Sequence, residues 1–115
     1  MNNYEHELQK ACITWFRLQY PKFKLNLFAI PNGGHRHRLT AKKLKAEGVV
    51  SGVSDLFLAV PSGGSHGLFI DMKVKPNRPT DNQILFGKCM MESGYHFELC
   101  YSLNKFIEIV TLWMK

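Results

Sequence analysis

The chain has 115 residues and a mass of 13.2 kDa, which is enough for one hydrophobic core, so we expect a single domain, residues 1–115, with one site. Its formal net charge of +6 favours a polyanionic partner such as nucleic acid, although charge alone does not separate nucleic acid from an anionic membrane surface. No run of 18 uncharged apolar residues is present, which excludes a membrane-spanning helix from the sequence.

The cysteines indicate a cytoplasmic protein. The chain has three, Cys12, Cys89 and Cys100, an odd number of widely spaced residues in apolar surroundings. They form neither a disulfide framework nor a CxxC zinc signature. The N-terminal segment also lacks the basic and apolar pattern of a signal peptide. We therefore expect three buried free thiols in a soluble protein that stays in a reducing cytoplasm.

The first predicted element is a helix from about residue 3 to residue 20. Its apolar residues recur at the spacing of one helical face, and Pro21 ends the pattern. The residues expected on the buried face are Leu8, Ala11, Cys12, Trp15 and Leu18.

A strand and a basic helix are predicted next. Residues 25–30 are a short apolar run, which is typical of a strand. The following loop, 31–34, contains Pro, Asn and two Gly residues, so its backbone can approach a ligand closely. Residues 40–47 then favour a short basic helix, which Gly48 ends.

The central part of the chain predicts a β-hairpin. Residues 55–60 and 66–74 are rich in branched and aromatic side chains, and a turn-forming cluster at 61–65 separates them. Thr80 and Gln83 form a capping box that starts a helix running to about residue 93. We expect a fourth strand at 95–101 and, capped by Ser102, a last helix.

The predicted order is therefore α, β, α, β, β, α, β, α. This order is typical of an α/β fold with a small mixed sheet flanked by helices. Its second strand-helix-strand unit crosses from the hairpin to the fourth strand.

The hairpin contains the residues that point to a chemistry. Side chains alternate along a strand, so Asp71 and Lys73 project from the same face, roughly 7 Å apart. The other face is apolar, and we expect it to cover the core while a charged face remains. An acid-x-Lys triplet occurs about once by chance in a chain of this length. However, an unpaired carboxylate in the middle of an apolar strand is costly to desolvate, so Asp71 requires a cation.

Asp55, at the start of the preceding strand, supplies a second carboxylate to the same place. Two neighbouring carboxylates stay ionised only if a cation holds them, and Mg²⁺ is the hard, oxygen-binding ion that suits them. Without Asp71, Asp55 would be better explained as an acid at the start of a strand or in a turn. The sequence thus predicts a metal site for phosphodiester cleavage, in which Lys73 positions the attacking water or stabilises charge on the phosphate.

Two further side chains are candidates for the same site. Glu5 shares the inward face of the first helix, whereas Glu7 is turned about 200° away from it. Glu5 also suits a solvated acid favoured by the helix dipole. Gln83 has the reach to orient Lys73 or a phosphate, but its capping role already explains it.

Basic residues follow the glycine loop and predict a wall for a phosphate backbone. The alternative is a solvated basic face. His35 and His37 lack a second pair of zinc ligands at metal spacing, so we do not expect a zinc site. The predicted DNA-binding residues are Asn32, Gly33, Gly34, Arg36, Arg38, Lys42, Lys43, Lys45, Lys75 and Arg78.

The combination of these motifs resembles the VRR-NUC family, the virus-type replication-repair nuclease branch of the PD-(D/E)XK phosphodiesterases. The resemblance rests on Glu5 and Gln9, Pro31-Asn32-Gly33-Gly34, Gly48, Gly52-Val53-Ser54-Asp55, Gly67-Leu68-Phe69-Ile70-Asp71-Met72-Lys73, and Gln83. It implies a restriction-endonuclease-like core and Mg²⁺ or Mn²⁺ as cofactor.

Carried over by position, the resemblance assigns roles to these residues. Glu5, Asp55 and Asp71 match the acidic positions, Lys73 the catalytic lysine and Gln83 the glutamine beyond it. Met72 matches a position whose backbone carbonyl binds the metal. Two departures occur: Ser54 stands where the family usually has proline, and Asp71 where glutamate is commoner.

The compact chain resembles the stand-alone phage-type form, similar to Holliday junction resolvases, in a bacterial or phage-infected cell. We therefore expect a metal-dependent DNA endonuclease selective for branched DNA. Because symmetric cutting of a four-way junction needs two sites, we expect a homodimer. Two alternatives remain open at this point, a non-catalytic nucleic-acid-binding module and a nuclease of linear duplex DNA.

Overall fold

The computed structural model describes residues 3–31 and 38–115, with the side chains of residues 38–40 left out. Its centre is a sheet in the order β1 (Leu27–Ala29), β2 (Leu56–Leu58), β3 (Leu68–Met72) and β4 (His96–Cys100). The first two pairings are antiparallel, and β3 pairs with β4 in parallel. The helical elements are α1 (Asn3–Gln19), the 3₁₀ helix η1 (Pro21–Phe23), α2 (Arg38–Ala46), α3 (Asp81–Glu92) and α4 (Leu103–Trp113).

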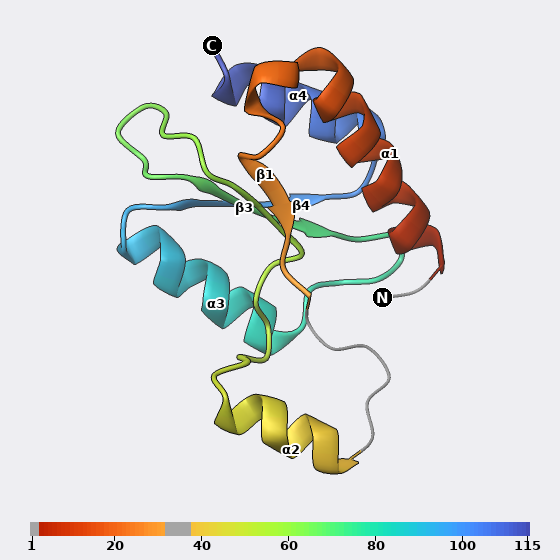
Figure 1. Cartoon of the computed structure of the whole chain (residues 1–115), viewed down its shortest axis with the longest axis vertical. Helices are drawn as coiled ribbons and strands as arrows, with labels where there is room; N and C mark the ends of the chain where they lie inside the picture. Colours follow the sequence, from red (N-terminus) through yellow and green to blue (C-terminus); the bar gives the residue numbers. More distant parts are fainter. Residues whose placement is uncertain (1–2, 32–37) are drawn as a thin grey trace.

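The predicted fold class and element order are confirmed. Figure 1 shows α1 and α4 on one side of the sheet and α3 on the other, so the sheet lies between two helical layers. The crossover from β3 through α3 to β4 is the predicted strand-helix-strand unit. The first strand is shorter than predicted, because η1 and the turn after it extend to residue 26.

Local signals explain two helix starts. The Thr80 side chain accepts a hydrogen bond from the Gln83 N–H at 3.2 Å, and the Gln83 side chain accepts one from the Thr80 N–H at 2.8 Å. This reciprocal pair is the predicted capping box. The Ser102 hydroxyl likewise accepts the N–H of Lys105 at 3.1 Å and caps α4.

The core lies between the sheet and the layer of α1 and α4. Alternate residues of β2 and β3 point into it, as the strand period requires. Residues of α1, α4 and β4 complete the buried cluster. The fully buried members are Cys12, Phe16, Leu56, Leu58, Leu68, Ile70, Met72, Cys100, Phe106 and Val110.

The opposite face of the sheet was predicted to be charged, and it carries aromatic side chains beside Asp71 and Lys73. The Phe69 ring packs against Phe57 with ring centroids 4.4 Å apart and against Phe86 of α3 at 5.2 Å. Through Phe86, α3 lies over this face. Asp71 and Lys73 are buried. The alternation was predicted correctly, but the cover was not.

Two expected burial sites are wrong. Leu18 is 79% exposed, because α1 buries Cys12 and Phe16 and a residue two positions beyond Phe16 lies about 200° around the helix. Cys89 is a free thiol as predicted, but it is exposed, since α3 buries Gly87 on its opposite side. The other two cysteines are buried free thiols.

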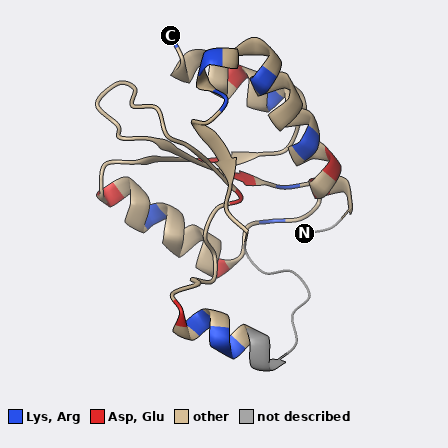
Figure 2. Cartoon of the chain, viewed as in Figure 1, with Lys and Arg blue, Asp and Glu red and all other residues tan. Residues whose placement is uncertain are grey.

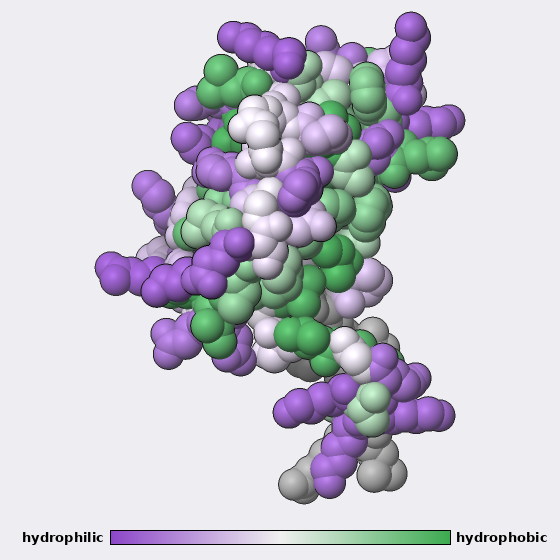
Figure 3. Space-filling view, turned by 90° about the vertical axis from the view of Figure 1, so that its left-hand side faces the viewer, coloured by the Kyte–Doolittle hydropathy of each residue, from purple (hydrophilic) through white to green (hydrophobic). Residues whose placement is uncertain are grey.

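Helix α2 carries a basic surface at one end of the molecule. Its described lysines, Lys42, Lys43 and Lys45, are exposed, and Figure 2 shows them as a blue cluster apart from the sheet. In Figure 3 hydrophilic side chains extend from the same end. Within residues 3–31 and 38–115, no helix is long and apolar enough to cross a membrane.

Gly52 joins the segment before β2 to the start of α3. Its φ is +91°, and a Cβ added there would lie 2.4 Å from the carbonyl oxygen of Asn82. Gly48 has a similar φ of +104°, but an added Cβ meets no described atom within 4 Å. A side chain at Gly52 would therefore meet both an unfavourable backbone conformation and close packing, whereas a side chain at Gly48 would meet only the unfavourable conformation.

We expect Gly52→Ala to be more destabilising than Gly48→Ala. Both substitutions cost the strain of a left-handed backbone, and Gly52→Ala adds overpacking of about 1–3 kcal/mol against a backbone atom. Urea unfolding of the two variants measures the difference. Equal free energies of unfolding would contradict the close approach of this segment to α3.

Candidate active site

The hairpin brings Asp55 and Asp71 together. The register of β2 and β3 places Leu56 opposite Ile70, so the residues just beyond, Asp55 and Asp71, face each other across the strands. The Asp55 N–H donates to Asp71 Oδ1 at 3.3 Å. The Met72 N–H donates to Asp55 Oδ2 at 2.7 Å. Each carboxylate is thus held by the backbone of the neighbouring strand, which fixes its orientation.

Burial makes this pair electrostatically demanding. The Asp71 side chain is completely buried, and Lys73 is 7% exposed. The second oxygen of Asp71, Oδ2, is buried without a hydrogen-bond partner among the described residues. A carboxylate oxygen in this state is costly unless a cation or a water binds it.

The pKa values of both aspartates reflect the cost of burying their carboxylates. Burial, followed by the charge of Asp55, raises the pKa of Asp71 from 3.8 to about 7. Burial is also the main cause that raises the pKa of Asp55, and the charge of Glu5 adds to it. The Lys73 ammonium acts in the opposite direction on both groups. Without a cation, the pair therefore tends to retain a proton near neutral pH.

Glu5 enters the site from α1. It is 9% exposed, and its charge acts on Asp55, so the predicted inward phase of α1 is correct, whereas Glu7 is exposed. The Asn77 side-chain amide donates to Glu5 Oε2 at 3.5 Å. The Tyr101 hydroxyl donates to the Asn77 carbonyl at 3.2 Å. The segment between β3 and α3 is thereby tied to the acidic centre.

The remaining candidates lie in different places. The side-chain oxygen of Gln83 is used in the capping box of α3, while its amide nitrogen is not part of that box. Lys75 and Arg78 are exposed on the segment that follows β3. Asn32, Gly33, Gly34 and Arg36, and the side chain of Arg38, lie outside the described residues.

Three polar groups were not among the predicted site residues. Asn77 hydrogen-bonds Glu5, and both Gln9 Oε1 and Ser54 Oγ are buried without a hydrogen-bond partner in the described part of the chain. Gln9 stands one helical turn after Glu5, so the phase that selected Glu5 also selects Gln9. Ser54 precedes Asp55 directly. No sequence pattern pointed to Asn77, because its contact with Glu5 spans 72 positions in the sequence.

The donor set suits a hard divalent cation. Asp55 and Asp71 offer carboxylate oxygens, one of them buried and unpartnered, and oxygen ligands are those that Mg²⁺ prefers. The described residues contain no group of three or more His, Cys, Asp or Glu side chains arranged to hold a metal ion. A cation here would therefore need ligands besides side chains, from backbone carbonyls, waters or a phosphate.

Comparison with known proteins connects this geometry with a family. The VRR-NUC domain matches residues 3–104. Among solved structures, one described as a VRR_NUC domain protein has a TM-score of 0.85 and 22% sequence identity, with 99% of this chain and 90% of that chain covered. At this identity the likeness establishes the fold. No curated protein matches the chain. Because the domain match spans most of its length, the chain belongs to the VRR-NUC domain family, a family of nucleases.

Proposed function

We propose that this nuclease is a metal-dependent DNA endonuclease whose cation is held by Asp55 and Asp71. The observation that carries the proposal is the buried, unpartnered Oδ2 of Asp71 beside a second carboxylate. A folded protein bears such a cost where the group has a ligand to bind. Mg²⁺ or Mn²⁺ fits this oxygen chemistry, and the Met72 carbonyl is a further ligand implied by the family resemblance.

Each residue of the chain has a defined task in this proposal. Asp55 is held in position by the Met72 N–H, so its free lone pairs stay directed at one place. Lys73, buried beside the two acids, balances their charge and stabilises negative charge on the attacked phosphate. Glu5, oriented by Asn77, holds the attacking water or accepts its proton. When bound, the cation supplies Lewis-acid stabilisation of the phosphoryl oxygen and lowers the pKa of a water.

We expect Asp71→Asn to lower the cleavage rate by at least about 100-fold because it removes a proposed ligand of the cation. Lys73→Met should lower it similarly because it removes a positive charge that stabilises the transition state. DNA affinity should change little, since exposed basic residues make most phosphate contacts. Single-turnover cleavage and fluorescence anisotropy measure the two quantities. Asp81→Asn and Lys88→Met are the matched controls on the exposed side of α3, and wild-type cleavage by the site variants would refute the assignment.

The raised pKa of Asp71 predicts how stability depends on pH. The folded chain binds this proton more tightly than the unfolded chain, so its contribution is complete below the unfolded pKa of 3.8 and is lost as the pH rises through about 7. Relative to Asp71→Asn, the metal-free protein should lose up to about 1.4 kcal/mol of unfolding free energy per pH unit in this range. Chemical denaturation at a series of pH values measures the loss.

Metal binding by Asp55 and Asp71 distinguishes a nuclease from a non-catalytic binding module. Calorimetry at neutral pH should detect Mg²⁺ binding to the wild type, and Asp71→Asn should abolish it. An absence of metal uptake by the wild type would instead favour the non-catalytic nucleic-acid-binding module, whose affinity would rest on the exposed lysines of α2.

For the substrate, we propose branched DNA such as a Holliday junction, cut by a homodimer with two active sites. The basic charge of α2 stands apart from the sheet, and it therefore offers phosphate contacts away from the scissile bond. A structure with several arms supplies phosphates at both places. The competing substrate is linear duplex DNA, which the same chemistry can hydrolyse.

Cleavage of linear, forked and four-way DNA, mapped with and without Mg²⁺, tests this choice. We expect paired symmetric cuts in the four-way junction at protein concentrations that leave linear duplex intact. Replacing Lys42, Lys43 and Lys45 with Ala should reduce the salt dependence of junction binding by a log–log slope of up to about 3. The control replaces Lys24, Lys88 and Lys115, which carry the same charge elsewhere. Equal cutting of all three DNA forms would refute branch selectivity.

A further inference from the structure

Strand β4 is an edge of the sheet. In the described part of the chain it pairs with β3 on one side, and no strand pairs with it on the other. All of its residues except Cys100 are half-buried. Exposed edges are templates for pairing with another strand, so a natural protein either protects them or uses them.

The hydrogen-bond pattern identifies the outward groups. The His96 N–H donates to the Gly67 carbonyl, and the Cys100 carbonyl accepts from the Lys73 N–H. In a parallel ladder, alternate residues direct both backbone groups to the same neighbour, so His96, Glu98 and Cys100 serve β3. Phe97 and Leu99 therefore present their N–H and C=O groups at the open edge.

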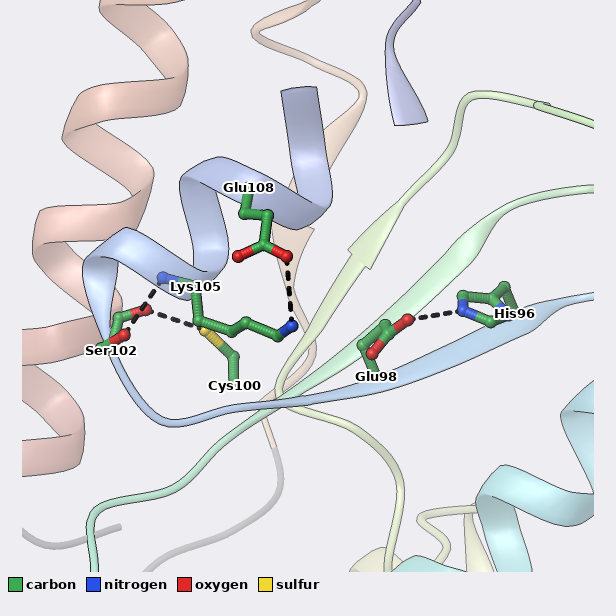
Figure 4. A network of polar contacts seen from close by, with 6 residues as sticks. All are labelled: His96, Glu98, Cys100, Ser102, Lys105 and Glu108. Atoms are coloured by element: carbon green, nitrogen blue, oxygen red, sulfur yellow. Dashed lines mark hydrogen bonds and ion pairs between the residues drawn. The ribbon is translucent and has the colours of Figure 1, made fainter. Parts of the chain in front are cut away.

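The side chains along this edge include a hydrogen-bonded pair of a histidine and a glutamate. His96 Nε2 and Glu98 Oε2 are 2.7 Å apart, and both side chains are partly exposed. Figure 4 shows this pair on β4, facing the same layer as Lys105 and Glu108 of α4. The His96 ring also stacks on Trp113, with centroids 5.8 Å apart.

A pocket of about 370 Å³ borders the edge on the α4 side. Its lining includes His96 and Glu98, the turn between β2 and β3, and Leu112 of α4, which is 61% exposed. A chain that pairs with β4 thus meets further surface beside the strand, partly charged and partly apolar.

We propose that β4 pairs antiparallel with β4 of a second copy of this chain, with the two-fold axis at Phe97. This register lets the two Phe97 residues exchange N–H···O=C bonds, and each Leu99 N–H reaches the Tyr95 carbonyl of the other copy. The Tyr95 N–H is already bonded to the Met90 carbonyl and takes no part.

Charge selects this register over its nearest competitor. An axis at Phe97 places His96 directly opposite Glu98 of the other copy, twice by symmetry. An axis at Glu98 satisfies the outward backbone groups equally well, but it places the two Glu98 carboxylates opposite each other. Directly opposed carboxylates repel each other, whereas a histidine ring opposite a glutamate can donate a hydrogen bond to it.

The pairing would also position the active sites, and in this respect it rests on the proposed function. The two-fold axis of an antiparallel pair is perpendicular to the sheet, so both acidic centres face the same side of one eight-stranded sheet. Asp71 lies beside Leu99, one strand in from the edge. Strand spacing and rise then put the two Asp71 residues about 20 Å apart. Two sites on one face can act on two strands of one branched DNA molecule.

Sedimentation velocity without DNA or metal tests the interface. The wild type should dimerise between about 1 and 100 µM, and Glu98→Lys should raise the dimer dissociation constant at least about ten-fold. The charge-exchanged variant His96→Glu/Glu98→Lys should restore dimerisation. Glu108→Lys is the matched control beside the same pocket, and circular dichroism confirms that each variant is folded.

Cysteine cross-linking tests the register. In a Cys89→Ser background, a mixture of His96→Cys and Glu98→Cys chains should form an interchain disulfide, because directly opposed non-hydrogen-bonded pairs have Cα atoms about 4.5 Å apart. Either variant alone should cross-link at least about ten-fold more slowly, because its two cysteines are not opposite each other and a disulfide requires Cα atoms within about 7 Å. A monomeric wild type, an unaffected Glu98→Lys dimer, or efficient cross-linking of Glu98→Cys alone would each overturn the proposal. None of these outcomes bears on metal binding or on phosphodiester hydrolysis at a single active site, which are judged separately. A monomeric wild type would in addition contradict the paired cuts proposed for a homodimer.

Discussion

The hydrogen bond from the Met72 N–H to the Asp55 carboxylate is the interaction on which the site depends. It continues the contact between β2 and β3 beyond the last residue pair of their ladder, and the reciprocal contact from the Asp55 N–H to Asp71 closes the same corner. The Asp55 side chain therefore takes part both in the hydrogen bonding between the strands and in the acidic centre. The backbone of the two strands therefore positions both carboxylates, as a preorganised electrostatic site requires.

Much of this centre was accessible from the sequence because its signals are local and periodic. Strand alternation placed Asp71 and Lys73 on one side of β3, and helical phase separated the buried Glu5 from the exposed Glu7. The capping box gave the start of α3 for a similar reason, since all its atoms lie within four residues. The periods of a strand, 2 residues, and of a helix, 3.6 residues, fix the direction of a side chain relative to its neighbours in the chain. The two strands of the hairpin then lie side by side because a short turn joins them.

The parts that sequence reasoning missed depend on contacts between distant segments. The layer of Phe57, Phe69 and Phe86 lies on the face that was expected to be charged. No local pattern specifies that α3 lies over this face, because the crossover length permits many packing positions. The exposure of Leu18 has a related origin: the apolar pattern does not show which side of α1 meets the neighbouring layer, and the structure buries Phe16, about 200° around the helix from Leu18. Asn77 is joined to Glu5 only by the folded chain.

The balance of buried charge gives a separate reason to expect a divalent cation. Glu5, Asp55 and Asp71 would contribute three negative charges when ionised, and Lys73 is the one buried cation among the described residues. The sum of these four groups is therefore −2, in a chain whose total formal charge is +6. Protonation of Asp71 removes one of these two negative charges, but a protonated carboxyl group is a weaker ligand for a cation. One divalent cation would neutralise both while every carboxylate stays ionised, and only then does the centre stop repelling the phosphate that the basic exterior attracts.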